Sequence, residues 1–147
     1  MKTIYNAVTA ELKTLVPELN WVDLDRGQID YYHLHPAMEY PGALIDVELN
    51  ECESIYQNTQ QCIASVILRI VQNPYASESD AMPTLEQAQN RSSQCYDLVD
   101  KVYQALQGLE IGELSPLSRL GQYKEIRDDG LFVYRIEFHT ILDDLVS

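Results

Sequence analysis

His33 and His35 are the residues of this chain best suited by type and spacing to bind a metal ion. One residue separates them, so their imidazoles would share a face of an extended segment, and Asp30 and Glu39 are near enough to complete a site of two histidines and one carboxylate. The alternative is a pair of loop histidines beside prolines. We favour the loop, because metal sites usually draw ligands from more than one element and no further ligand is visible. His33 and His35 remain weak metal candidates, and we predict no metal site.

Paired acids offer a second possible chemistry. Asp46 and Glu48 lie on the same side of a predicted strand, and paired carboxylates are the catalytic groups of glycosidases. Acid and base roles require an environment that separates the two pKa values, and two acids on a strand are more often a solvated face. His139 lies on the polar side of the last predicted strand and has no nucleophile that the sequence pairs with it.

Motifs whose spacing defines a mechanism are absent from the sequence. It contains no phosphate-binding loop, dinucleotide fingerprint, zinc-protease motif, nucleophile elbow or calcium loop. We therefore predict no catalytic residue, no cofactor-binding residue and no cofactor. The chain is not expected to be an enzyme.

Tyrosine is the most informative residue type in the chain. The sequence has ten tyrosines but only two phenylalanines and one tryptophan. A tyrosine presents a large apolar body with a polar tip, which suits protein interfaces. The alternative, that half of the tyrosines cap the core, stays open. Five tyrosines fall in or beside predicted loops and strand ends and are possible interface residues: Tyr31, Tyr32, Tyr40, Tyr56 and Tyr75.

Length and charge limit the class of protein. A chain of 147 residues corresponds to a single domain, residues 1–147, and its net charge is −13. Tight binding to nucleic acid or to an anionic membrane needs clustered basic residues, whereas the ten bases here are scattered. We therefore expect no sequence-specific nucleic-acid partner and no membrane. With no apolar run of membrane-spanning or signal-peptide length, the expected location is the cytoplasm.

Three cysteines, an odd number without a CxxC pair, suggest neither a disulfide framework nor a zinc site. We predict reduced thiols, with Cys62 and Cys95 in the core and Cys52 exposed.

Hydrophobic periodicity predicts the elements of the first half. The segment before Pro17 repeats its apolar residues every 3.6 positions, as an amphipathic helix does. The run from Cys62 is apolar on both faces and predicts a central strand. The predicted elements are a helix at 2–16, short extended pieces at 21–25 and 28–32, a loop at 33–41, a strand at 43–49, a polar loop at 50–61 and a strand at 62–71.

A long helix gives the clearest pattern in the chain. Thr84 and Gln87 form a capping box before it, and Gly108 closes its end. Its apolar stripe is expected to be core. The stripe, spaced alternately by three and four residues, consists of Leu85, Ala88, Ser92, Cys95, Val99, Val102, Leu106 and Leu109.

A hairpin is predicted at the end of the sequence. Asp129-Gly130 lies between the apolar-patterned runs 120–126 and 131–142, a strong local hairpin signal. The order of helix, strands, long helix and hairpin indicates the α+β class. We expect a mostly antiparallel, mixed sheet of four to five strands, packed with an N-terminal helix, one long second helix and a C-terminal β-hairpin.

The order of elements and a few local strings resemble a family. These strings are Trp21 to Gln28, the Tyr40-Pro41-Gly42-Ala43-Leu44-Ile45 segment, and the hairpin turn at Asp128-Asp129-Gly130. In this respect the chain is similar to the tail terminator, minor tail and head-tail joining proteins of long-tailed phages and prophages.

The resemblance implies a sheet flanked by two helices and a structural protein without a cofactor. About six copies would form a ring that caps the tail tube. The implied partners are further copies, the tail tube protein and a neck or head-completion protein. The protein would be cytoplasmic in a bacterial host and a component of the virion. The alternatives are a small cytoplasmic α+β adaptor or ligand-binding domain and a metal-dependent hydrolase using His33 and His35.

Overall fold

The computed structural model describes residues 1–30, 38–74 and 82–145, and within these ranges the chain forms two helices and five strands. The elements are α1 (Lys2–Leu15), β1 (Trp21–Leu24), β2 (Gly42–Tyr56), β3 (Thr59–Gln72), α2 (Leu85–Leu106), β4 (Ser118–Lys124) and β5 (Phe132–Leu145).

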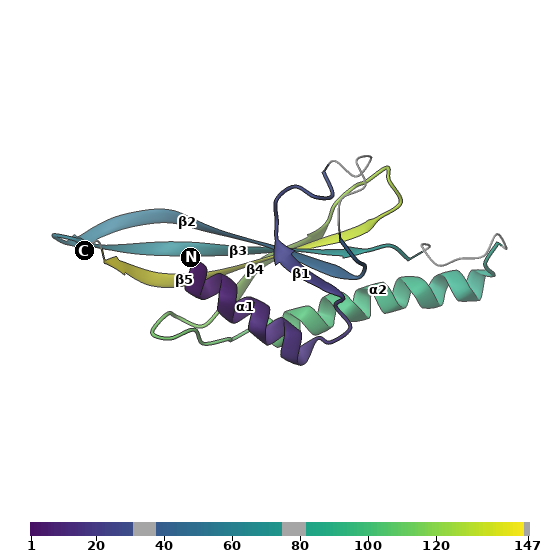
Figure 1. Cartoon of the computed structure of the whole chain (residues 1–147), viewed down its shortest axis with the longest axis horizontal. Coiled ribbons are helices and arrows are strands. Elements are labelled where there is room, and N and C mark those ends of the chain that lie inside the picture. Colours follow the sequence, from purple (N-terminus) through teal and green to yellow (C-terminus); the bar gives the residue numbers. More distant parts are fainter. Residues whose placement is uncertain (31–37, 75–81, 146–147) are drawn as a thin grey trace.

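The five strands form one mixed sheet in the order β1-β2-β3-β5-β4. β1 runs parallel to β2, whereas every other neighbouring pair is antiparallel. Both helices lie on the same side of the sheet (Figure 1). The prediction of an α+β fold with a mixed sheet, an N-terminal helix, a long second helix and a C-terminal hairpin is confirmed.

The main core lies between the helices and the covered face of the sheet. Side chains alternate between the two faces of a strand, so every second residue of β2, β3 and β5 contributes to it. In register across the sheet, Val47 pairs with Val66 and Val66 with Phe138. Phe138 is fully buried and its ring stacks with Tyr103 of α2. The alternation predicted for the last strand, with Ile136 and Phe138 directed to the core, is confirmed.

A smaller cluster covers one end of the opposite face. It consists of Ile29, Leu44, Val71, Leu131 and Val133. The segment after β1 and the turn between β4 and β5 therefore pack on this face. No helix of the described residues covers the rest of this face, and several of its side chains are partly open to solvent.

The predicted polar loop at 50–61 is wrong, because this segment is strand. β2 and β3 form a long hairpin that turns at residues 57 and 58. Its side chains are mostly polar and exposed, so they lack the apolar pattern on which the prediction depended. Backbone pairing between the two strands does not require buried side chains.

This hairpin also corrects the prediction of reduced thiols. Pairing of β2 with β3 brings the Cα atoms of Cys52 and Cys62 to 4.1 Å, and the two residues form a disulfide bond. A loop at 50–61 would not bring these two cysteines together, which is why the prediction left them reduced. Cys95 is a free, buried cysteine, in agreement with its predicted place in the core.

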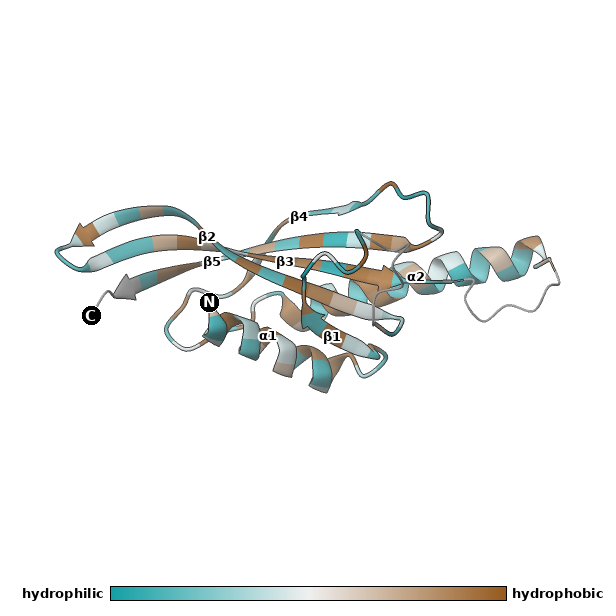
Figure 2. Cartoon of the chain, turned by 45° about the horizontal axis from the view of Figure 1, so that its top comes forward, coloured by the Kyte–Doolittle hydropathy of each residue, from teal (hydrophilic) through white to brown (hydrophobic). Residues whose placement is uncertain are grey.

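The hairpin and the end of β5 extend past α1 as a three-stranded projection (Figure 2). We call residues 50–63 and 141–145 the arm. It contains four acids, Glu51, Glu53, Asp143 and Asp144, and no lysine or arginine.

Candidate functional site

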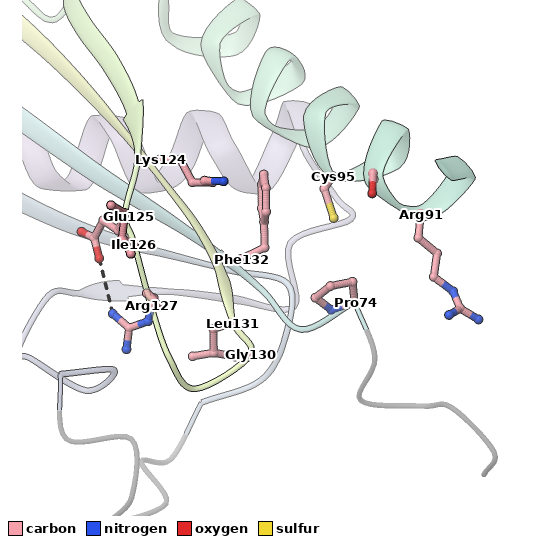
Figure 3. A pocket seen from close by; sticks show the side chains of 11 residues that line it. Pro74, Arg91, Cys95, Lys124, Glu125, Ile126, Arg127, Gly130, Leu131 and Phe132 are labelled. Atoms are coloured by element: carbon pink, nitrogen blue, oxygen red, sulfur yellow. Dashed lines mark hydrogen bonds and ion pairs between the residues drawn. The ribbon is translucent and has the colours of Figure 1, made fainter. Parts of the chain in front are cut away.

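An open cleft of about 320 Å³ lies between α2 and the turn that joins β4 to β5 (Figure 3). Arg91 and Cys95 border it from α2, and Lys124, Arg127 and Phe132 border it from the strands and the turn. Burial raises the pKa of the Cys95 thiol, which disfavours the thiolate form. Because the thiolate is the nucleophile, the cleft lacks an activated cysteine.

Two arginines hold the segments beside this cleft together. Arg69, which projects from β3 on the face opposite the helices, donates two hydrogen bonds each to Asp30 and Glu125 at 2.8 to 3.2 Å. Arg127 donates to Asp129, to Glu125 and to the backbone carbonyl of Ile29. The network thus joins the segment after β1, the last part of β3 and the β4–β5 turn.

The charges in this network stabilise one another. Burial by itself lowers the pKa of Arg69, but hydrogen bonds to Glu125 and Asp30 outweigh it and raise that pKa. The hydrogen bond from Arg69 lowers the pKa of Asp30, and the bond from Arg127 lowers the pKa of Asp129. Arg69, Asp30 and Asp129 therefore stay charged near neutral pH. Such pairing suits a structural role, because the hydrogen bonds connect three segments of the chain.

The first three turns of α2 lie outside the core. The capping box of Thr84 and Gln87 is confirmed, so the helix begins as predicted. Leu85 is nevertheless 75% exposed, and Ser92 is exposed as well. The prediction that the whole stripe is core is therefore wrong for Leu85 and Ser92, and Ala88 is only half-buried. The helix extends beyond the sheet, as Figure 1 shows, and burial of its side chains begins at Cys95.

The arm carries exposed apolar side chains at the other end of the molecule. Tyr56 is 74% exposed near the hairpin turn, and Ile55 and Ile141 are also largely exposed. Exposed aromatic and aliphatic side chains are candidates for interaction surfaces. Such side chains occur on the arm and, at Leu85, on the first turn of α2.

The predicted interface tyrosines have different surroundings. Tyr40 is partly buried and packs against the smaller cluster, whereas Tyr56 is exposed on the arm. Tyr31, Tyr32 and Tyr75 lie outside the described residues.

The two histidines of the weak metal candidate, His33 and His35, also lie outside the described residues. Of the two acids proposed to complete that site, Asp30 accepts hydrogen bonds from Arg69 with both carboxylate oxygens. Among the residues that the structure describes, no group of three histidine, cysteine or acidic side chains is arranged to hold a metal.

Asp46 and Glu48 project, as predicted, on the face opposite the helices. In register, Glu48 pairs with Ser65 and Ser65 with His139. The Ser65 hydroxyl oxygen accepts a hydrogen bond from the Asn50 side-chain amide at 2.6 Å. The Nδ1 atom of His139 has no hydrogen-bond partner within the described part of the chain. A serine nucleophile needs a base hydrogen-bonded to it, so this row lacks the geometry of a catalytic dyad.

The sequence-based reasoning missed the arginine network and the arm. Arg69 gave one local signal, because it is a single charge within an apolar run predicted to be a central strand. A charge in that position must find partners on other segments. No local signal identified those partners.

None of the helices in the described ranges is long and apolar enough to cross a membrane.

Comparison with known proteins finds no matching family model and no matching curated protein. Among solved structures, the chain is similar to one from the "Virion of native gene transfer agent (GTA) particle". The TM-score is 0.48 and the sequence identity 14%, over 95% of this chain and 94% of that chain. A likeness at this level carries no argument about function, so the proposals below depend on the residues of this chain.

Proposed function

We propose that this chain is a phage- or prophage-derived structural protein that caps the tail tube and forms part of the head-tail junction as an oligomeric ring, without catalysis. The observation that carries the proposal is the exposure of Leu85 at the beginning of α2, on the line of the buried stripe. Leu85 and Ala88 lie on the same side of the helix as the buried Cys95 and Val99, but beyond the sheet.

A helix that extends past its own core needs another surface to be stable. Isolated helical segments of this length are marginal in water, and most helical stability comes from packing of the apolar face. Leu85 would gain about 1.5 to 3 kcal/mol on full burial, reduced in proportion to what it already buries. A neighbouring subunit would supply the missing surface.

Two different contact surfaces at opposite ends of the subunit favour a ring over a two-fold symmetric dimer. A head-to-tail contact joins unlike surfaces and closes into a ring when the rotation between subunits allows it. Leu85 on α2 at one end, and Ile55 and Tyr56 near the turn of the arm at the other, are the exposed apolar side chains that would meet. The order of elements, helix, strands, long helix and terminal hairpin, agrees with the phage family that the sequence resembles.

The proposed partners are further copies of the chain, about six in a ring, together with the tail tube protein and a neck or head-completion protein. The protein would assemble in the cytoplasm of the host and become part of the virion.

Light scattering after size-exclusion chromatography, together with negative-stain electron microscopy, tests the proposal. The wild-type chain should form rings as its concentration rises and should bind the ends of tail tubes. Leu85→Glu should lose the rings, because it places a charge in the contact. Asn90→Glu is the matched control, since Asn90 is exposed on the opposite side of the same helix.

A strictly monomeric wild-type chain at high concentration, with no ring on tube ends, would contradict the proposal. Equal loss of rings in Leu85→Glu and Asn90→Glu would show that the stripe is not the contact.

A further inference from the structure

The outer edge of β2 is only partly paired. β1 pairs with it from Gly42 to Ile45, and beyond Ile45 no described strand continues this row. The chain leaves the edge at Asp25, whose backbone N–H donates to the carbonyl of Ile45. A regular stretch of β2 follows, paired on its inner side with β3 up to Asn50, where a bulge begins.

Backbone groups on this stretch point toward the open edge. The N–H and C=O groups of successive residues in a strand point alternately to its two sides. Since the Ile45 carbonyl points outward, those of Val47 and Leu49 do too. Unpaired edges of this kind are templates for an added strand.

A groove lies where β1 ends. It has a volume of about 470 Å³ and is bordered by α1, by the end of β1 and by Asp46 and Val47 of β2. Its apolar lining includes Met1, Tyr5 and Leu24. Its other charged residues are Lys2, Asp23 and Arg26, and Arg26 is paired with Asp23 at 2.9 Å. A strand that follows β1 along the edge would pass through this groove.

The two faces of the edge differ in character. Val47 and Leu49 lie on the helix-covered face, where both are only partly buried and pack against the main core. Asp46 and Glu48 lie on the open face. An added strand would therefore meet apolar side chains on one face and carboxylates on the other.

The acids also argue against a second copy as the occupant. Two β2 edges placed together would oppose carboxylates to carboxylates, which is destabilising. The free end of β5 is acidic as well, at Asp143 and Asp144. On the edge strand β4, Lys124 lies on the helix-covered face, where a continued sheet would put it beside Val47 or Leu49 and away from Glu48.

We propose that the edge of β2 at Val47–Leu49 is a strand-addition site for an extended segment of a different protein in which basic and apolar residues alternate. The apolar residues cover Val47 and Leu49 and fill the groove, and the basic residues pair with Asp46 and Glu48. This mode takes its affinity from backbone hydrogen bonds and its selectivity from the alternating side chains. The inference does not require ring formation.

A labelled hexapeptide, Lys-Val-Lys-Val-Lys-Val with blocked ends, tests the site by fluorescence anisotropy at protein concentrations where the chain is monomeric. We expect saturable binding that weakens as salt rises. Hydrogen exchange of the Val47 and Leu49 amides should slow in the complex. The same peptide with glutamate in place of lysine should not bind, and N-methylation of alternate amides should weaken binding at least tenfold.

Charge variants separate this site from general attraction to an acidic protein. The double variant Asp46→Asn, Glu48→Gln should bind the lysine peptide several-fold more weakly. The matched control, Glu86→Gln with Glu110→Gln, removes two exposed acids elsewhere and should bind as the wild type does.

Three results would overturn the proposal. The first is binding that N-methylation does not change, since backbone pairing would then play no part. The second is an equal loss in the two charge variants. The third is protection of the Val47 and Leu49 amides that grows with protein concentration in the absence of peptide, which would identify a second copy as the occupant.

Discussion

Replacement of Arg69 by methionine is expected to destabilise the protein strongly. The Arg69 side chain is 9% exposed, and its guanidinium group forms salt bridges with Asp25, Asp30 and Glu125 at 2.8 to 3.3 Å. Methionine keeps much of the volume of the side chain but removes the cation that these three carboxylates share, and only Glu125 keeps a contact with Arg127, at 3.4 Å.

The size of the effect follows from the burial of the partners. Removal of one member of a buried ion pair costs about 3 to 5 kcal/mol. Asp30 is 49% exposed, so water compensates part of the loss, and the lower end of the range applies. We therefore expect the free energy of unfolding to fall by about 3 kcal/mol, roughly a 100-fold change in the folding equilibrium.

A lower pH should reduce the stability difference between the wild type and Arg69→Met. The hydrogen bond from Arg69 lowers the pKa of Asp30 below its ordinary value of 3.8. A carboxylate with a lowered pKa stabilises the folded state above its unfolded pKa, and this contribution is lost as the pH falls through the folded value. Wild type and Arg69→Met should therefore converge in stability as the pH falls from 7 to below 4.

Urea denaturation followed by circular dichroism at both pH values measures these effects. Arg26→Met is the matched control, because Arg26 is 55% exposed and its ion pair with Asp23 lies at the surface. Its cost should stay within about 0.5 kcal/mol. The reasoning is refuted if the two variants lose equal stability at pH 7, or if the deficit of Arg69→Met is as large in acid as at neutral pH.

A substitution and a reduction experiment test the packing of the sheet and the arm. A Cβ atom at Gly42 would lie 2.8 Å from the Met38 methyl group and 3.0 Å from a backbone oxygen, so Gly42→Ala should cost about 1 to 3 kcal/mol of stability, measured by thermal unfolding. Gly121 has open space around it, so the control Gly121→Ala should be neutral or slightly stabilising. Equal effects of the two substitutions would contradict the argument. Reduction of the Cys52–Cys62 bond should lower stability by about 2 to 3 kcal/mol, as measured by urea denaturation with and without dithiothreitol. The double variant Cys52→Ser, Cys62→Ala should not respond to the reductant, and a response would place the effect elsewhere.

The elements that the sequence predicted correctly are those whose burial follows a regular period. The stripe of Ile4, Val8 and Leu12 gave α1, and the alternation from Phe132 to Phe138 gave the face of β5 that meets the core. The capping box before Leu85 located the start of α2. Each of these signals is local, because the residues that produce it lie within a few positions of one another.

The hairpin at 50–61 could not be predicted in this way. Its side chains are polar and exposed, so no apolar alternation marks it as strand. Its structure depends on backbone hydrogen bonds to β3, and the disulfide bond depends on the same pairing. The wrong prediction for the first half of α2 has a similar cause, since an apolar stripe continues in the sequence whether or not the sheet beneath it does.

By itself, the sequence determined the class of fold, the two helices, the central strand and the absence of motifs for catalysis, because all of these depend on residue type and local spacing. Only the tertiary structure decided which charges pair with Arg69, where the sheet ends beneath α2, and which edge of β2 is left open. These features depend on segments that are distant in the sequence and meet only when the strands pair. The surfaces on which we base both proposals belong to this second group.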